Sequence, residues 1–239
     1  MKIVIVNGSP RKGNTYSAIN AFVEGAKDNN DIEVIDSYKL KISPCVACGT
    51  CECYKGCVAK DDSNPTVDKL VNADMIIFAT PVYWWGITAQ IKLVIDKCYC
   101  KGALLKNKKV GVIAIGGSPT TNVQYELIEK QFQCIGDYLD WDIKFHKSFF
   151  ASEKDDLLKN ESAMKELKAL GKARRRHLSP PIQCSLYERS LGGQGFRPAA
   201  GGIRRRFPQT FRPGVRAPRP PLSELRLQQH LPWQLLRQH

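Results

Sequence analysis

The stretch IVIVNGSPRKGNTYS, residues 3–17, decides the fold that the sequence predicts. Four apolar residues in succession predict a buried β-strand, and a polar loop with two glycines leads from that strand into a predicted helix. Free N–H groups and the helix dipole favour an anion at such a helix start, so the loop suits a phosphate, although a capped helix without a ligand has the same sequence. The polar side chains available for this purpose are Ser9, Arg11, Asn14, Thr15 and Ser17.

The loop does not match the two common nucleotide-binding patterns. A P-loop has the right separation between Gly8 and Gly13, but Asn14 stands where its lysine should reach the outer phosphates. The dinucleotide pattern fails as well, because Ser9 and Pro10 follow the first glycine. The loop therefore predicts a site for one terminal phosphate rather than for a triphosphate.

Residues 1–172 alternate between short apolar runs and helix-like segments, which predicts a single α/β domain. The fold expected is a doubly wound, five-stranded parallel sheet with helices on both faces. We expect strands at residues 2–6, 32–38, 75–80, 110–115 and 140–149, and helices at 15–28, 66–71, 88–97, 122–135 and 153–170, the last ended by Gly171. Strands this apolar should be buried on both faces.

Residues 173–239 have a different composition. They hold 13 of the 14 arginines and nine of the 14 prolines, whereas all 22 lysines fall at or before Lys172. The net charge is +2 up to Lys172 and +11 beyond it. We predict a disordered basic tail that comes from another reading frame or a fusion scar, and we do not favour its alternative role as an arm for nucleic acid.

No apolar run is long enough to cross a membrane, and the first residues do not resemble a signal peptide. We therefore expect a cytoplasmic protein that does not associate with a membrane.

Two further loops lie at carboxyl ends of predicted strands, where doubly wound sheets bind ligands. The loop TPVYWWGIT, residues 80–88, concentrates aromatic side chains, which suits a flat conjugated ring. A contact between subunits is the alternative explanation for Tyr83, Trp84 and Trp85. The loop GGSPTTN, residues 116–122, follows the fourth strand.

The motifs GSPRKGNT (8–15), TPVYWWGITAQIKLVID (80–96) and GGSP (116–119), in this order, resemble the NAD(P)H-dependent FMN reductase family of flavodoxin-like proteins over about residues 1–172. The resemblance implies that the FMN phosphate is held by Ser9, Arg11, Asn14, Thr15 and Ser17. It implies that the isoalloxazine ring lies along Pro81, Val82, Tyr83, Trp84 and Gly86, with Gly116 and Gly117 as a third wall.

The same resemblance implies an FMN-dependent oxidoreductase that takes hydride from NAD(P)H and passes electrons to flavin, quinone or similar small-molecule acceptors in a ping-pong cycle. The flavin carries the chemistry, so no catalytic side chain is expected. An electron carrier between protein partners and a binding or sensor protein without activity are the alternatives. A homo-oligomer, either dimer or tetramer, is expected from the family.

Five of the nine cysteines lie between residues 45 and 57. The spacing C-x2-C-x2-C-x5-C of Cys45, Cys48, Cys51 and Cys57 suits a [4Fe-4S] cluster and resembles the iron-sulfur flavoproteins of this family. A zinc site and a loop without metal are the alternatives. Cys53 is left over. Cys98, Cys100 and Cys134 are predicted to be small core residues.

Overall fold

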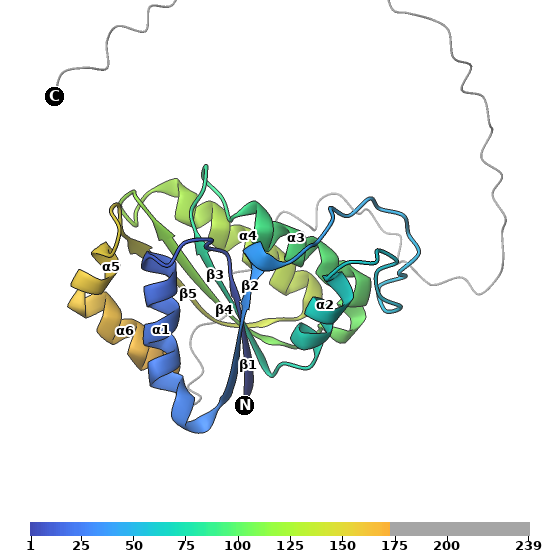
Figure 1. Cartoon of the computed structure of the whole chain (residues 1–239), viewed down its shortest axis with the longest axis horizontal. Helices are drawn as coiled ribbons and strands as arrows, with labels where there is room; N and C mark the ends of the chain where they lie inside the picture. Colours follow the sequence, from blue (N-terminus) through green and yellow to red (C-terminus); the bar gives the residue numbers. More distant parts are fainter. Residues whose placement is uncertain (173–239) are drawn as a thin grey trace, which may run out of the picture. The chain divides into compact units, whose positions relative to one another are not determined.

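The sheet predicted from the sequence is present in the computed structural model, which describes residues 1–172. Five strands lie in the order β2-β1-β3-β4-β5, and every neighbouring pair is parallel. They are β1 (Lys2–Asn7), β2 (Asp31–Asp36), β3 (Met75–Pro81), β4 (Lys109–Gly116) and β5 (Asp142–Phe150). The flavodoxin-like doubly wound fold is confirmed (Figure 1). The predicted tail, residues 173–239, lies outside the described residues.

Helices cover both faces of the sheet (Figure 1). They are α1 (Asn14–Ala26), α2 (Ser63–Val71), α3 (Ala89–Cys98), α4 (Val123–Leu139), α5 (Asp156–Lys159) and α6 (Glu161–Lys172), with 3-10 turns η1 (Lys27–Asn29), η2 (Ser37–Lys39) and η3 (Tyr99–Leu104). Helices α1, α5 and α6 pack on one face, and α2, α3 and α4 pack on the other. None of these helices is long and apolar enough to cross a membrane.

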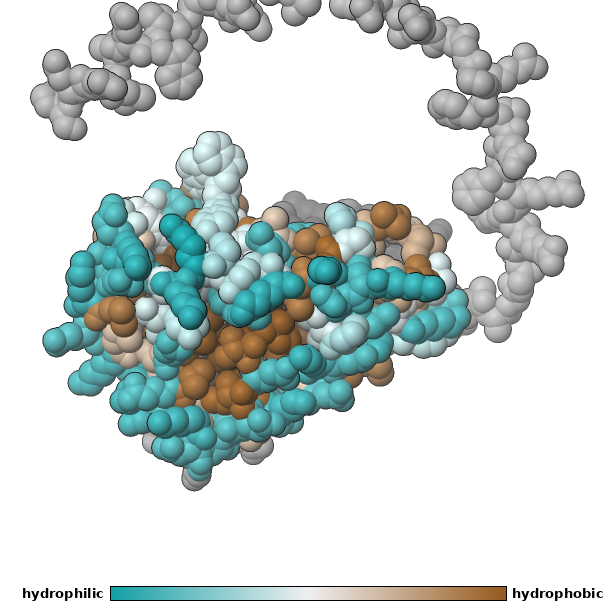
Figure 2. All heavy atoms as spheres, viewed as in Figure 1, coloured by the Kyte–Doolittle hydropathy of each residue, from teal (hydrophilic) through white to brown (hydrophobic). Residues whose placement is uncertain are grey.

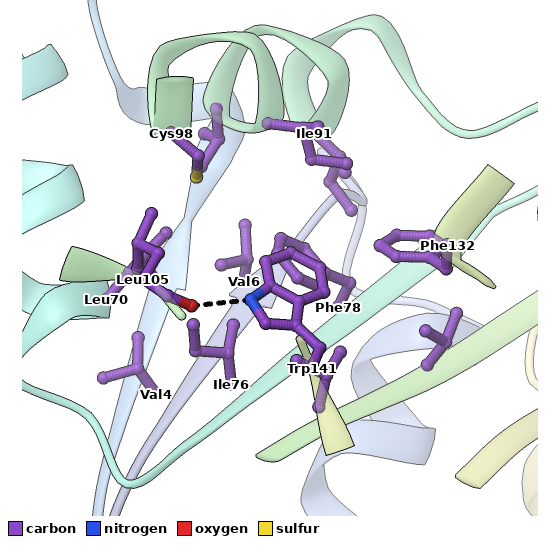
Figure 3. Close-up of a cluster of buried hydrophobic side chains, with 14 of the residues drawn as sticks. Val4, Val6, Leu70, Ile76, Phe78, Ile91, Cys98, Leu105, Phe132 and Trp141 are labelled. Carbon is purple, nitrogen blue, oxygen red and sulfur yellow. Dashed lines mark hydrogen bonds between the residues drawn. The ribbon is translucent and has the colours of Figure 1, made fainter. Parts of the chain in front are cut away.

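The period of two along the central strands divides the core between these faces. On β1, Val4 and Val6 join the cluster under α2, α3 and α4, whereas Ile3 and Ile5 join the cluster under α1 and α6. In the first cluster the buried indole of Trp141 donates a hydrogen bond to the Leu105 carbonyl at 2.7 Å (Figure 3). That bond satisfies the one polar atom of the ring, so the indole can be buried at little cost.

The structure corrects the prediction that every strand is buried on both faces. Strands β1, β3 and β4 are almost wholly buried, but β2 and β5 form the edges and are partly exposed. Val34 on β2 is 42% exposed, and Figure 2 shows apolar residues gathered over this edge between hydrophilic ones. Cys98 and Cys100 are buried as predicted, and burial raises the pKa of the Cys98 thiol to about 12. Cys134 is exposed on α4, so its prediction as a core residue is wrong.

The last predicted helix is broken into α5 and α6, and Gly171 does not end it. Gly171 lies inside α6, at a point where this helix packs closely on α1. A Cβ at Gly171 would overlap the Phe22 carbonyl, and a Cβ at Gly25 would overlap the Lys168 carbonyl, so glycine is needed at both positions. These glycines set the distance between the two helices, and α1 in turn carries the polar loop of residues 8–13 at its start.

A tight turn follows β3. Tyr83 N–H donates to the Gly86 carbonyl at 2.9 Å and Gly86 N–H returns a bond of 3.0 Å to Tyr83. The two central residues both have positive φ, 48° at Trp84 and 63° at Trp85, a conformation that turns normally fill with Asn or Gly. Trp84 is 91% exposed, and the turn projects from the surface (Figures 1 and 2). The turn therefore presents both tryptophans on the surface in a strained backbone conformation.

We predict that Gly25→Ala lowers the free energy of unfolding by about 3 kcal/mol, because the new methyl group meets backbone atoms of α6 that cannot rotate away. Urea denaturation measures the change. Gly102→Ala is the matched control, since its Cβ would meet only the Leu139 side chain at 3.9 Å. Equal stability of the two variants would contradict the close helix contact.

We predict that Trp85→Gly is more stable than Trp85→Ala by about 1 kcal/mol, because both variants lose the indole but only glycine adopts positive φ without strain. Thermal and urea unfolding of the pair measure this difference. If the alanine variant is at least as stable as the glycine variant, the turn does not hold residue 85 in this conformation.

Candidate functional site

Backbone hydrogen bonds between neighbouring strands continue at the carboxyl edge of the sheet. Gly8 N–H donates to the Ala79 carbonyl at 2.8 Å, Val82 N–H to Ile115 at 2.7 Å, and Ala151 N–H to Gly116 at 2.9 Å. The segments that leave β1, β3, β4 and β5 are therefore fixed at one edge, side by side. This is the edge where doubly wound sheets bind ligands.

A pocket of about 450 Å³ lies among these four segments. It brings together nine of the residues predicted for a cofactor: Ser9, Arg11, Asn14, Thr15, Pro81, Val82, Tyr83, Gly116 and Gly117. Three predicted residues do not line it. Ser17 lies one turn inside α1, where its hydroxyl donates to the Gly13 carbonyl at 3.2 Å, and Trp84 and Gly86 belong to the projecting turn.

The pocket also has lining residues that the sequence reasoning missed. They are Lys12, Gly13, Ile115, Ala151, Ser152, Glu153 and Lys154. Residues 151–154 follow β5, so the rule that selected the ends of the first, third and fourth strands would have selected this segment too. The sequence carried that signal, but residues 151–154 contain no glycine or aromatic motif that marks them.

The first wall of the pocket is the start of α1. No side chain caps this helix at Gly13, so its first N–H groups are open to an anion. The Ser9 hydroxyl donates to the Arg11 carbonyl at 3.0 Å and accepts from the Arg11 N–H at 3.3 Å, which shapes the loop before the helix. The arrangement matches the anion site predicted from the opening stretch of the sequence.

Asn14 ties this wall to the segment after β5. Its side-chain Nδ2 donates to the Glu153 carbonyl at 2.8 Å, and its Oδ1 accepts from the Leu157 N–H at 3.1 Å. Each end of the amide is therefore engaged by the chain itself, which fixes the orientation of the Asn14 side chain.

Val82–Tyr83 and Ile115–Gly117 lie side by side in the pocket lining, and their apolar atoms form one surface, called the ring slot below. A Cβ at Gly116 would lie 2.8 Å from the Tyr125 hydroxyl and 3.1 Å from the Val82 Cβ, so only glycine fits there. The buried Gln124 Nε2 has no hydrogen-bond partner and lies 3.1 Å from the same point. Burial raises the pKa of Tyr125, which keeps its hydroxyl protonated and donating to the Ser118 carbonyl.

These residues fit a phosphorylated flat ring. The start of α1 with Arg11 suits the phosphate, and the ring slot beside Gly116 suits a planar ring. An apolar slot with a few polar groups at one end is the usual form of a cofactor site.

The cysteine loop is a separate feature, bound to the end of α3 and to η3. Gly56 N–H donates to the Cys100 carbonyl at 3.2 Å, and Ala103 N–H to the Cys53 carbonyl at 3.1 Å. Lys97 reaches the loop from α3: it is only 3% exposed, and its Nζ donates to the Cys57 Sγ at 3.4 Å. The loop is thus anchored at its second half.

The four predicted cluster ligands are not gathered. Within residues 1–172, no three His, Cys, Asp or Glu side chains lie together as a group that could hold a metal ion. Cys45 and Cys48 are exposed, whereas Cys51 and Cys57 are partly buried. A hydrogen bond from the Thr50 backbone N–H lowers the pKa of the Cys48 thiol. Four thiols on one loop are chemically suited to an iron-sulfur cluster, but Cys45 and Cys48 must move to meet the other two.

Known proteins support the flavin interpretation. The chain is 35% identical over 144 residues to an iron-sulfur flavoprotein of Methanosarcina thermophila, a match that covers 58% of this chain and 73% of the relative. It is 34% identical over 125 residues to an iron-sulfur flavoprotein of Methanocaldococcus jannaschii, covering 49% of this chain and 63% of the relative.

A solved NAD(P)H:quinone oxidoreductase of Methanothermobacter marburgensis has the same fold, with a TM-score of 0.58 and 16% sequence identity. The match covers 74% of this chain and 99% of that one. Residues 1–133 match the NADPH-dependent FMN reductase family, and they include three of the four segments that form the pocket. The chain therefore belongs to the NADPH-dependent FMN reductase family of flavin-dependent oxidoreductases.

Proposed function

We propose that the protein binds FMN in the pocket at the carboxyl ends of β1, β3, β4 and β5 and uses it to oxidise NAD(P)H. The observation that carries this proposal is the juxtaposition in one pocket of an uncapped helix start with Arg11 and an apolar slot closed by Gly116. The family to which the chain belongs supports the choice of FMN and of a nicotinamide donor.

The chain supplies binding, orientation and access. The Ser9–Thr15 segment and the first N–H groups of α1 hold the phosphate, and Val82, Tyr83 and Gly117 flank the ring. FMN held by these residues would supply the redox chemistry, namely acceptance of hydride from a nicotinamide and transfer of electrons to an acceptor.

Tyr83 lies at the outer side of the slot and is 42% exposed. An incoming flat ring can therefore stack beside it. The nicotinamide and the acceptor then use the same place in turn, which gives ping-pong kinetics. The acceptors proposed are free flavin, quinones or similar small molecules. The exposed tryptophans of the neighbouring turn support the further proposal of a homo-oligomer, because they offer apolar area to a second copy.

We predict that the full chain quenches FMN fluorescence and, once loaded, oxidises NADPH in the presence of a quinone. Gly116→Val should lose both properties, because its side chain meets Tyr125 and Val82. The control variant Gly102→Ala, which is outside the pocket, should keep both. Absence of quenching by the unaltered chain would refute the site, and bound flavin without NADPH oxidation would favour an electron carrier.

The electron carrier is the second candidate function, in which the cysteine loop holds a [4Fe-4S] cluster. Two observations favour it: the relatives named above are iron-sulfur flavoproteins, and Cys45, Cys48, Cys51 and Cys57 share one loop. The buried Lys97 ammonium would offset part of the negative charge of a thiolate-ligated cluster, since its Nζ already contacts Cys57.

We predict that Cys48→Ala removes iron and sulfide from anaerobically reconstituted protein but leaves FMN bound. Cys53→Ala is the matched control, since Cys53 lies on the same loop and is not a predicted ligand, and it should retain both. Iron and sulfide assays together with the absorption spectrum give the result. Equal iron contents in the two variants would argue against these four ligands.

A further inference from the structure

The segment after β5 brings a cation to the pocket. Lys154 is exposed and lines the pocket together with Ser152 and Glu153, in a segment that adjoins Gly116 and Gly117 on one side and Asn14 on the other. No ion pair of the described residues involves Lys154 or Arg11. Both cations are therefore available to a ligand.

The position of this segment is fixed from two directions. The Ala151 N–H bonds to the Gly116 carbonyl at 2.9 Å, and the Asn14 amide binds Glu153 and Leu157. Asn14 is the first residue of α1, so its side chain connects the start of that helix directly to the residue before Lys154. Lys154 is consequently attached to the wall where an anion is expected.

The expected anion is strongly charged, so each cation of the pocket lining that reaches it adds to its binding. A phosphate monoester carries about −1.5 to −2 at pH 7, whereas a helix start contributes about +0.5. Arg11 adds one positive charge. Lys12 is a second cation of the pocket lining, on the same loop as Arg11. Lys154 is the remaining cation of the pocket lining.

We propose that Lys154 binds the FMN phosphate and that Asn14 is a positioning residue that holds Lys154 beside it. The inference rests on the proposed FMN site and adds to it a residue from the segment after β5. The Asn14 side chain serves the phosphate indirectly, because both ends of its amide are engaged by residues 153 and 157.

The test compares FMN with riboflavin, which has the same ring and no phosphate. Fluorescence titration of the full chain gives both dissociation constants, for the unaltered protein and for Lys154→Gln. We expect Lys154→Gln to weaken FMN about fivefold at low ionic strength and less at high salt, with riboflavin unchanged. Lys165→Gln, an exposed lysine of α6 outside the pocket, is the control and should change neither constant.

The role of Asn14 is tested by a double-mutant cycle. Asn14→Ala should weaken FMN but not riboflavin, and Asn14→Ala combined with Lys154→Gln should be no weaker than the worse single variant, because both act through one contact. Additive losses would overturn the positioning role. Thermal unfolding of each variant with riboflavin present controls for a loss of folded protein.

Three results would overturn the role of Lys154. These are unchanged FMN affinity in Lys154→Gln, equal weakening of FMN and riboflavin in that variant, and the same loss of FMN affinity in Lys165→Gln. If the unaltered chain does not bind FMN, the proposed function is wrong and this inference falls with it. If the unaltered chain binds FMN and only the results for Lys154→Gln disagree, the inference alone is wrong.

Discussion

The site depends on three backbone hydrogen bonds at the carboxyl edge of the sheet. The bonds from Gly8 to Ala79, from Val82 to Ile115 and from Ala151 to Gly116 hold the segments after four strands at one level. These bonds continue the parallel pairing of β1 with β3, of β3 with β4 and of β4 with β5. The apolar cores on the two faces of the sheet hold these strands in register. A shift of any one strand would separate the phosphate end of the pocket from its ring slot.

The helix layer on one face determines where the anion binds. Helix α1 begins at the pocket and is pressed against α6 through glycines at positions 25 and 171. The same pair of helices brings α5 and the segment after β5 next to the start of α1, where Asn14 joins them. The close packing of α1 on α6 thus places two walls of the pocket, and each wall carries a cation, Arg11 on one and Lys154 on the other.

Much of this could be predicted from the sequence. The apolar runs of β1, β3 and β4 and the polar loop before α1 are local patterns, so the fold class and the pocket walls after these strands could be read from them. The segment after β5 could have been selected as the end of a parallel strand, but its hydrogen bond to Asn14, a residue far away in sequence, could not be read from the sequence. Gly171 was assigned to a helix end because its contact with α1 is likewise not visible in the sequence.

The cysteine spacing predicted a cluster, and the structure does not gather those thiols, because only the second half of their loop is fastened to η3 and Lys97. No residue of that loop lines the pocket proposed for FMN, and the central claim of the account concerns this pocket. A crystal structure of the protein grown with FMN tests it most directly. We expect the phosphate at the first turn of α1 and the ring against the surface formed by Val82–Tyr83 and Gly116–Gly117. FMN bound instead in the apolar cavity of about 390 Å³ beside Tyr99 and Tyr138 would contradict the account.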